Sequence, residues 1–118
     1  MPPSDYKQII YEQHGRVARI VLNRPRYRNA QSRILLEELD HAFAYAGEDD
    51  SIGAIVLAGA GDHFSAGHDL GTPEEMADRE LRPIEEGLRG KYRRGFDQNI
   101  DKSLRWRNLP KPTIAAVQ

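Results

Sequence analysis

The 118-residue chain has room for one domain at most, and its 39% hydrophobic and 30% charged residues are typical of a globular protein rather than a disordered one. Its lack of cysteine excludes disulfide and thiol chemistry, and no apolar run approaches the ~20 residues that cross a bilayer. Its net charge is −1 and its N-terminus, "MPPSDYKQ", lacks a secretory-signal pattern, so we expect a cytoplasmic protein with no membrane partner.

Two runs rich in β-forming residues begin the chain. "YKQIIYEQ" at 6–13 and "RVARIVLNR" at 16–24 are separated only by "HG". They predict two antiparallel strands that are joined by a tight turn at Gly15.

A helix and a third strand are predicted next. Apolar residues recur at helical spacing after an N-cap at Asn29 or Ser32, and the helix should end near Gly47. The apolar run "IGAIVLAGAG" at 52–61 indicates a strand buried on both faces. Strand, helix and strand in this order predict a crossover between parallel strands in an α/β domain. The expected core residues are Ile20, Leu22, Leu39, Phe43, Ile55, Val56 and Leu57.

The pattern weakens after Gly71. A short helix can start at Pro73, but Pro83 interrupts it, and the three glycines of "EEGLRGKYRRG" indicate irregular chain. We therefore predict an irregular or mobile helical insertion at 77–107. A short amphipathic helix is expected near its end, and "KPTIAAVQ" at 111–118 begins another strand; the apolar residues of that helix are Ile100, Leu104 and Trp106. The end of the chain inside a strand suggests part of a larger domain.

The positive charge is concentrated late in the chain. Residues 79–107 hold nine basic and five acidic side chains, whereas residues 1–78 hold seven basic and thirteen acidic ones. The arginines of the later segment alternate with acids and are not interleaved with stacking aromatics. This favours a solvated helical face, with an anionic ligand as the alternative, and no nucleic-acid partner is expected.

The stretch "HFSAGHDLG", residues 63–71, concentrates side chains that could carry chemistry. Ser65 resembles the nucleophile of a G-x-S-x-G elbow, but His63 stands where that tight turn needs a small residue. A metal site formed by His63, His68 and Asp69 matches no established ligand spacing, and no metal is expected. Both side-chain hypotheses are therefore weak.

The backbone of the same stretch offers a third hypothesis. The small residues from Ser65 to Gly67 let the main chain approach a ligand closely, at the carboxyl end of a buried strand, where open α/β sheets bind ligands. Free N–H groups there could stabilise a developing oxyanion, which is worth roughly 3 kcal/mol per donor. Pattern alone leaves this hypothesis and a simple strand-to-helix turn equally open.

Three blocks in this order, "IVLNRPRYRNA", "AIVLAGAGDHFSAGHDL" and "KPTIAAVQ", resemble the N-terminal half of the crotonase superfamily, the enoyl-CoA hydratases and isomerases. The similarity covers roughly residues 6–76 and 108–118, and residues 77–107 match only in general character. The resemblance implies a crotonase-like spiral of strand-strand-helix repeats, of which residues 1–118 would be the N-terminal part. It also implies trimers that pair into hexamers.

The resemblance implies that the backbone N–H of His68, the residue after "SAG", is one donor of an oxyanion hole that polarises an acyl thioester carbonyl. The imidazole would be a spectator. Coenzyme A, a part of the substrate and not a cofactor, would lie against the loop after the second strand and the backbone of residues 65–69, with Arg24, Arg26 and Arg28 at its phosphates. The implied binding residues also include Asn29, Ala30, Ser65, Ala66, Gly67, Asp69 and Leu70.

We interpret Asp69 as a residue that orders the turn and caps the following helix rather than one that takes a proton. The family's second oxyanion donor and its acid and base glutamates would lie beyond Gln118. The visible glutamates match none of those motif positions, and their setting suggests helix surface; they are Glu74, Glu75, Glu85 and Glu86.

The implied reaction is hydration of a 2-enoyl-CoA in fatty acid metabolism, a lyase activity. The alternatives are another crotonase reaction, such as isomerisation or thioester hydrolysis, and a noncatalytic acyl-CoA-binding or assembly subunit. We expect the 118-residue chain alone to be incomplete and inactive.

Overall fold

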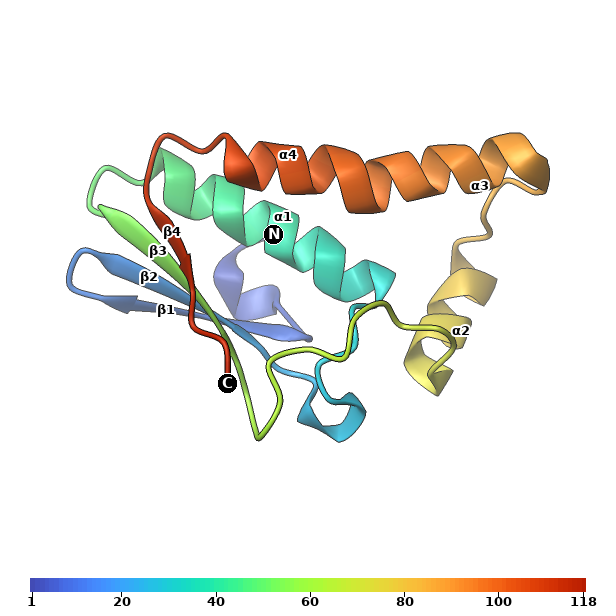
Figure 1. The fold of residues 1–118 in the computed structure, drawn as a ribbon, viewed down its shortest axis with the longest axis horizontal. Helices are drawn as coiled ribbons and strands as arrows, with labels where there is room; N and C mark the ends of the chain where they lie inside the picture. The colour runs from blue at the N-terminus through green and yellow to red at the C-terminus, as the bar shows by residue number, and fades with distance from the viewer.

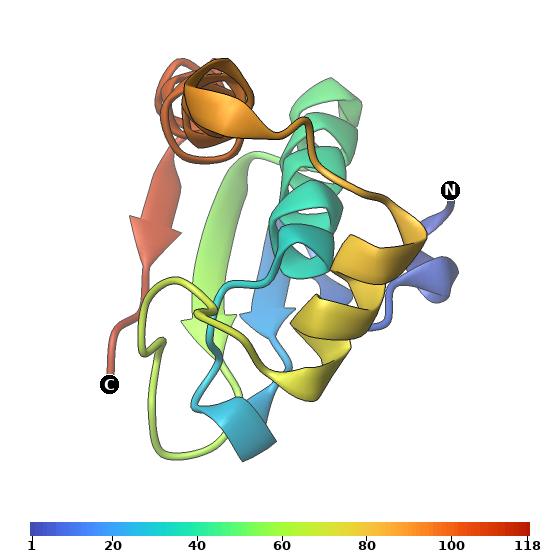
Figure 2. The same cartoon turned by 90° about the vertical axis from the view of Figure 1, so that its right-hand side faces the viewer.

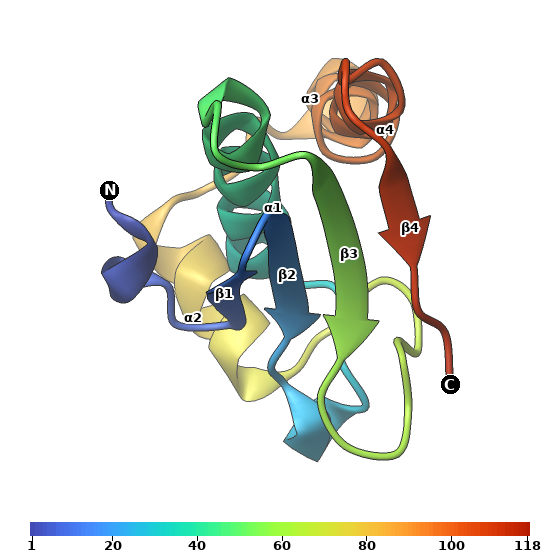
Figure 3. The same ribbon diagram turned by 90° about the vertical axis from the view of Figure 1, so that its left-hand side faces the viewer.

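The computed structural model describes residues 1–118, beginning with a hairpin that follows a short 3-10 turn, η1 (Pro3–Asp5). Strands β1 (Ile9–His14) and β2 (Val17–Leu22) pair antiparallel, as the two β-forming runs predict. Gly15 between them has a φ of +61°, a left-handed conformation that glycine adopts without steric cost. The hairpin forms one side of a four-stranded sheet with the order β1-β2-β3-β4 (Figure 3).

The predicted crossover is confirmed. Helix α1 (Arg33–Glu48) begins at Ser32, whose Oγ accepts a hydrogen bond from the Leu35 N–H at 3.0 Å. It returns the chain to β3 (Ala54–Gly59), which lies parallel to β2, and β4 (Thr113–Ala115) adds parallel to β3. The carboxyl ends of β2, β3 and β4 therefore lie at the same edge of the sheet, and the loops after β2 and β3 meet there (Figure 3).

A second group of helices follows β3. Helix α2 (Pro73–Leu81) starts at Pro73, as predicted, and has Thr72 as its N-cap. A long helical rod then runs through α3 (Gly87–Gly95), the π-helical η3 (Phe96–Asp101) and α4 (Lys102–Arg107), and it lies beside α1 (Figures 1 and 2). None of these helices combines the length and apolar character that a membrane crossing requires.

The helical rod occupies most of the segment 77–107, for which the glycines predicted an irregular or mobile helical insertion. An added Cβ at Gly90 would lie 1.8 Å from the Glu85 carbonyl oxygen, so this glycine permits a close backbone approach instead of breaking the helix. At the other end, the Trp106 ring stacks on Phe43 of α1 at 5.2 Å between centroids, and its Nε1 donates to Asp40 at 3.1 Å. Packing against α1 offsets the weak helix propensity.

The hydrophobic core lies between α1 and one face of the sheet. Five of the seven expected core residues are buried there, namely Ile20, Leu22, Leu39, Phe43 and Ile55. Val56 and Leu57 are only half-buried, so the prediction that the third strand is buried on both faces is wrong for this structure. The helices cover one face of the sheet (Figure 2), and successive residues of a strand point to opposite faces.

Leu35→Ala should lower the free energy of unfolding of the whole protein that carries these residues by about 3 kcal/mol, because the Leu35 side chain is 0% exposed and its removal leaves a cavity. Leu88→Ala removes the same atoms from an 84% exposed position and should cost less than about 0.5 kcal/mol. Urea denaturation measures both. Equal losses in the two variants would contradict this assignment of the core.

Candidate functional site

The site forms where the loop after β2 meets the loop after β3. The Ala66 N–H donates to the Arg28 carbonyl at 2.8 Å, and the Gln31 N–H donates to the Gly67 carbonyl at 2.7 Å. The Asp69 N–H returns a 3.0 Å bond to the Gln31 carbonyl, which makes a short parallel bridge between Gln31 and His68. Two segments about 36 residues apart thus hold each other like strands.

These bonds leave one N–H of the segment free. From Ala66 to Asp69, three N–H groups donate within the chain, since that of Gly67 bonds the Ser65 Oγ at 3.1 Å. The N–H of His68 has no partner. Gly67 has a φ of +98°, where a side chain would be strained, so glycine is needed for the turn that sets up this arrangement. Within residues 66–69 the geometry therefore leaves one backbone donor without a partner, at the position that the family resemblance implies.

The side chain of Ser65 serves the same loop. Its hydroxyl donates to the Asn29 carbonyl at 2.8 Å and accepts from Gln31 Nε2 at 3.1 Å. A nucleophilic serine would instead give its proton to a basic side chain, and none bonds it here. Ser65 is therefore a loop-ordering residue. No group of metal-ligating side chains that could hold an ion forms around His63, His68 and Asp69.

A buried ion pair fixes the two loops. Arg24 Nη1 lies 2.9 Å from Asp69 Oδ2, and the two side chains are 2% and 0% exposed. The same guanidinium donates to the Ala30 carbonyl at 2.6 Å and to the Thr72 hydroxyl at 3.0 Å. It also lies 3.1 Å from Glu74 at the start of α2. One arginine from the loop after β2 therefore reaches its own loop, the loop after β3 and α2.

Asn29 is a second tie. Its side chain is fully buried, accepts from the Arg24 N–H at 2.8 Å and donates to the carbonyls of Ala60 and His63 at 2.9 and 2.7 Å. Its backbone φ is +56°, a left-handed conformation that asparagine tolerates better than most residues. Asn29 thus orders the loops from within and is not exposed to a ligand.

Asp69 orders its turn, as predicted. Its Oδ1 accepts from the N–H groups of Gly71 and Thr72 at 2.9 and 2.8 Å, and its Oδ2 accepts from the Thr72 hydroxyl. Burial by itself raises the pKa of Asp69, but the hydrogen bonds from Thr72, Gly71 and Arg24 outweigh it and lower the pKa to about 2. The helix cap itself is Thr72, which accepts from the Glu75 N–H.

The expectation for the three arginines needs correction. Pro25–Tyr27 forms a 3-10 turn, η2, and Arg28 after it has a φ of +53°, so the chain turns between the three arginines instead of presenting them together. Arg24 is buried in its ion pair and is not free to bind a phosphate. Arg26 and Arg28 are exposed and line an open groove of about 770 Å³, together with residues of the facing loop. The other residues around this groove include Ala30, Ala66, His68, Asp69 and Leu70.

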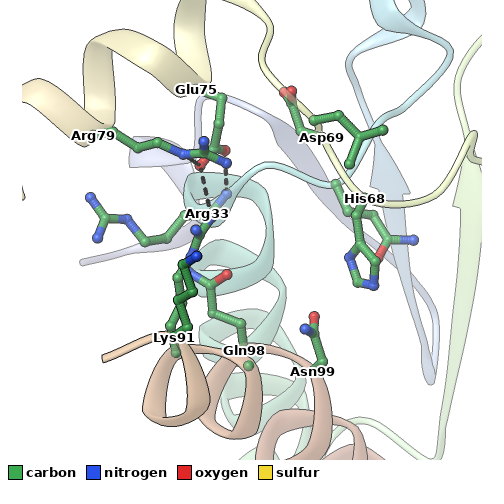
Figure 4. A pocket seen from close by; sticks show the side chains of 12 residues that line it. Arg33, His68, Asp69, Glu75, Arg79, Lys91, Gln98 and Asn99 are labelled. Carbon is green, nitrogen blue, oxygen red and sulfur yellow. Dashed lines mark hydrogen bonds and ion pairs between the residues drawn. The ribbon is translucent and has the colours of Figure 1, made fainter. Parts of the chain in front are cut away.

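A second pocket of about 390 Å³ lies on the other side of His68, between α1, α2 and α3. His68 and Asp69 stand on one side of it, Glu75 and Arg79 on the other, and Lys91, Gln98 and Asn99 on the helical rod (Figure 4). The groove and this pocket share only a few residues, His68, Asp69 and Leu70. The free N–H therefore belongs to the strip of chain that separates them.

Glu75 is the residue of this pocket that sequence reasoning misplaced on a helix surface. Its side chain is 2% exposed, and it accepts from the Arg33 N–H at 2.8 Å and lies 3.4 Å from Arg79 Nε. The spacing T-x-x-E from Thr72 is typical of a capping box, in which Glu75 would accept from the Thr72 N–H, but that N–H bonds Asp69 instead. The carboxylate satisfies the first turn of α1 instead of its own helix.

Asp69→Asn should lower the free energy of unfolding by about 3 kcal/mol at pH 7, because it leaves the Arg24 charge buried without its carboxylate. Because folding lowers the pKa of Asp69, the ionised carboxylate stabilises the folded protein fully above the unfolded-state pKa near 3.8. This stabilisation is lost as the pH falls through about 2. The gap between the variant and the natural protein should therefore narrow from pH 4 downward. Urea titrations at several pH values test this, with exposed Asp62→Asn as control; a gap independent of pH would contradict it.

Comparison with known proteins agrees with this architecture. The family model described as enoyl-CoA hydratase/isomerase matches residues 12–118. A Rhizobium meliloti protein named "Probable enoyl-CoA hydratase" is 45% identical over 95% of this chain and 38% of its own length. The chain spans about 40% of the length of the curated relatives it matches.

Solved structures show the same fold. A probable enoyl-CoA hydratase from Mycobacterium thermoresistibile superposes with a TM-score of 0.80 at 45% identity, over 93% of this chain and 41% of that one. An enoyl-CoA hydratase/isomerase from Xanthobacter autotrophicus Py2 superposes with a TM-score of 0.78 at 39% identity, over 96% and 39%. The chain therefore has the crotonase fold and belongs to the enoyl-CoA hydratase/isomerase family.

Proposed function

We propose that the protein carrying this chain hydrates a 2-enoyl-CoA thioester and that the His68 N–H donates to the thioester oxygen. The observation that carries the proposal is the free N–H of His68 between Ala66, Gly67 and Asp69, whose own N–H groups are all bonded within the chain. A donor held by surrounding hydrogen bonds needs no reorganisation when charge develops, which is the property that makes an oxyanion hole effective. Family membership supplies the reaction class.

The chemistry explains why a backbone donor suffices. The oxygen of water bonds C3 of the enoyl group as the water loses one proton to the base, and the electrons of the double bond move toward the thioester oxygen. The enolate then takes one proton at C2 from the acid, so that H and OH have been added across the double bond. The N–H of His68 interacts more strongly with the enolate oxygen than with the neutral carbonyl, so it lowers the barrier rather than merely binding substrate. The second donor and the acid and base groups, expected beyond Gln118, stay predictions.

Coenzyme A would occupy the open groove on the other side of the loop. Arg26 and Arg28 are exposed there and can donate to phosphate oxygens. The facing wall is formed by the loop after β3, which contributes Ala66, His68 and Asp69. Leu70, 92% exposed, stands at the rim, where an apolar part of the ligand can cover it. Arg24, Asn29 and Asp69 shape this groove from beneath. Coenzyme A enters as part of the substrate, and no separate cofactor is proposed.

Isomerisation and thioester hydrolysis use the same stabilised oxyanion, and a noncatalytic acyl-CoA-binding subunit could keep the same loops. Hydration is favoured because the similar proteins are named as hydratases. Turnover of a 2-enoyl-CoA to the 3-hydroxyacyl-CoA separates it from these alternatives. The role in fatty acid metabolism, the cytoplasmic location and the homo-oligomer, a trimer or a dimer of trimers, also stay part of the proposal. Sedimentation of the whole protein tests the assembly.

His68→Pro removes the N–H and should lower kcat/KM by roughly two orders of magnitude, equivalent to about 3 kcal/mol, because one oxyanion donor is lost. His68→Ala keeps the N–H and should change kcat/KM much less. Hydration kinetics of the whole protein measure both variants. Calorimetric binding of the hydroxyacyl-CoA product serves as the folding control.

Equal losses in the two His68 variants would assign the effect to the imidazole and contradict the backbone role. Failure of the natural protein to bind any acyl-CoA would remove the whole proposal. Binding without turnover would favour the noncatalytic alternative.

A further inference from the structure

The pocket beside His68 is unusually polar for a site that would receive an acyl chain. Of the twelve residues around it, only Leu70 is hydrophobic. Four are cationic and come from three helices, namely Arg33, Arg79, Lys91 and Arg94. Pockets for apolar ligands are lined mainly by hydrophobic and aromatic side chains. The lining therefore does not match a purely hydrocarbon acyl group.

The cations outnumber the carboxylates that can neutralise them. Asp69 is already paired with Arg24, and Arg33 Nε lies 2.7 Å from Asp78, outside the pocket. Glu75 remains as the partner of two arginines, because its Oε1 lies 3.4 Å from Arg79 Nε and 3.9 Å from Arg94 Nη2.

Lys91 forms no ion pair, although it lines the same pocket on the helical rod (Figure 4). Burial lowers the pKa of Arg94, and the neighbouring charges of Arg79 and Arg33 lower it further, while Glu75 opposes them. Among residues 1–118, one carboxylate in the pocket thus faces three cations, and these side chains carry a net positive charge that an anion would neutralise.

We propose that this pocket binds a carboxylate on the acyl group, so that the preferred substrates are 2-enoyl-CoA thioesters whose acyl chain ends in a carboxylate. This rests on the proposed function, which places the thioester at the His68 N–H. The acyl chain would extend from there into the pocket, toward Arg79, Lys91 and Arg94. Gln98 and Asn99 on the rod add neutral donors for the same anion.

Coenzyme A phosphates are the other source of anionic oxygen, and position argues against them. The groove on the opposite side of His68 has its own free cations, Arg26 and Arg28. A thioester held at the strip between the two cavities directs its two ends to opposite sides. The groove would then take the coenzyme A, and the cationic pocket would take the acyl group.

The test compares two substrates on the whole protein, crotonyl-CoA and glutaconyl-CoA, which share the 2-enoyl thioester and differ in a terminal carboxylate. The natural protein should show the higher kcat/KM for glutaconyl-CoA. Lys91→Gln should lower the kcat/KM for glutaconyl-CoA relative to that for crotonyl-CoA roughly tenfold. Lys91 has no internal ion-pair partner, so this change leaves no carboxylate unpaired.

Arg89→Gln is the matched control. Arg89 is exposed on the same helix, two residues from Lys91, and does not line the pocket, so the substitution removes one positive charge outside it. It should leave the substrate ratio within about twofold of the natural value. An equal shift in both variants would show a long-range charge effect and overturn the proposed site. If Lys91→Gln lowered kcat/KM equally for both substrates, the lysine would be assigned to a coenzyme A phosphate, and the proposed carboxylate site would again be overturned.

Calorimetry with the unreactive pair butyryl-CoA and glutaryl-CoA separates this inference from the proposed hydration. Tighter binding of glutaryl-CoA that Lys91→Gln abolishes supports the carboxylate site even if neither enoyl-CoA is hydrated, a result that would overturn only the hydratase proposal. Turnover of crotonyl-CoA with no preference for the carboxylated ligand of either pair would overturn only the carboxylate site.

Discussion

The buried ion pair between Arg24 and Asp69 joins the loop after β2 to the loop after β3, and the geometry of both cavities follows from that junction. Taking two charges out of water costs several kcal/mol per ion, so such a pair is favourable only when the remaining polar atoms are satisfied. Each partner here takes part in four hydrogen bonds, and only Arg24 Nε is left without one. The pair therefore fixes a geometry more than it adds net stability.

That geometry has a direct consequence for the backbone between the two loops. Gln31 bonds the backbone of Gly67 and Asp69 on both sides of His68, and Arg24 holds the Asp69 carboxylate, so the N–H of His68 lies between fixed neighbours. A donor that is oriented before substrate arrives is the property that the proposed chemistry needs. The proposed role uses only the main chain, so it is compatible with the exposed histidine side chain at this position.

In the two proposals, the main chain binds the thioester oxygen and side chains bind the acyl group. The thioester oxygen is common to every acyl-CoA, and a backbone N–H recognises it whatever the acyl group is. The acyl group differs between substrates, and the residues that would recognise it are side chains of α2 and the rod, such as Arg79 and Lys91. Glu75 supports this arrangement because its buried carboxylate ties Arg79 to the start of α1.

The sequence by itself determined the local elements, because these depend on residues that are close along the chain. The hairpin at Gly15 and the start of α2 at Pro73 were predicted correctly, and Ser32 is the cap of the two that the pattern allowed. Family resemblance extended this to the crotonase fold. The role of His68 that it implies stays a prediction.

Only the tertiary structure decided which charges meet and which amide stays free. Arg24 and Asp69 are 45 residues apart, and the acceptor of the Arg33 N–H is Glu75, 42 residues away. A sequence shows that such side chains can ionise but not the distance between them, so Arg24 was expected at a phosphate and Glu75 on a surface. The helical rod has the same origin, because packing of Trp106 on Phe43 stabilises a segment whose glycines disfavour a helix. These features depend on contacts between residues that are far apart in the sequence, and no local pattern encodes such contacts.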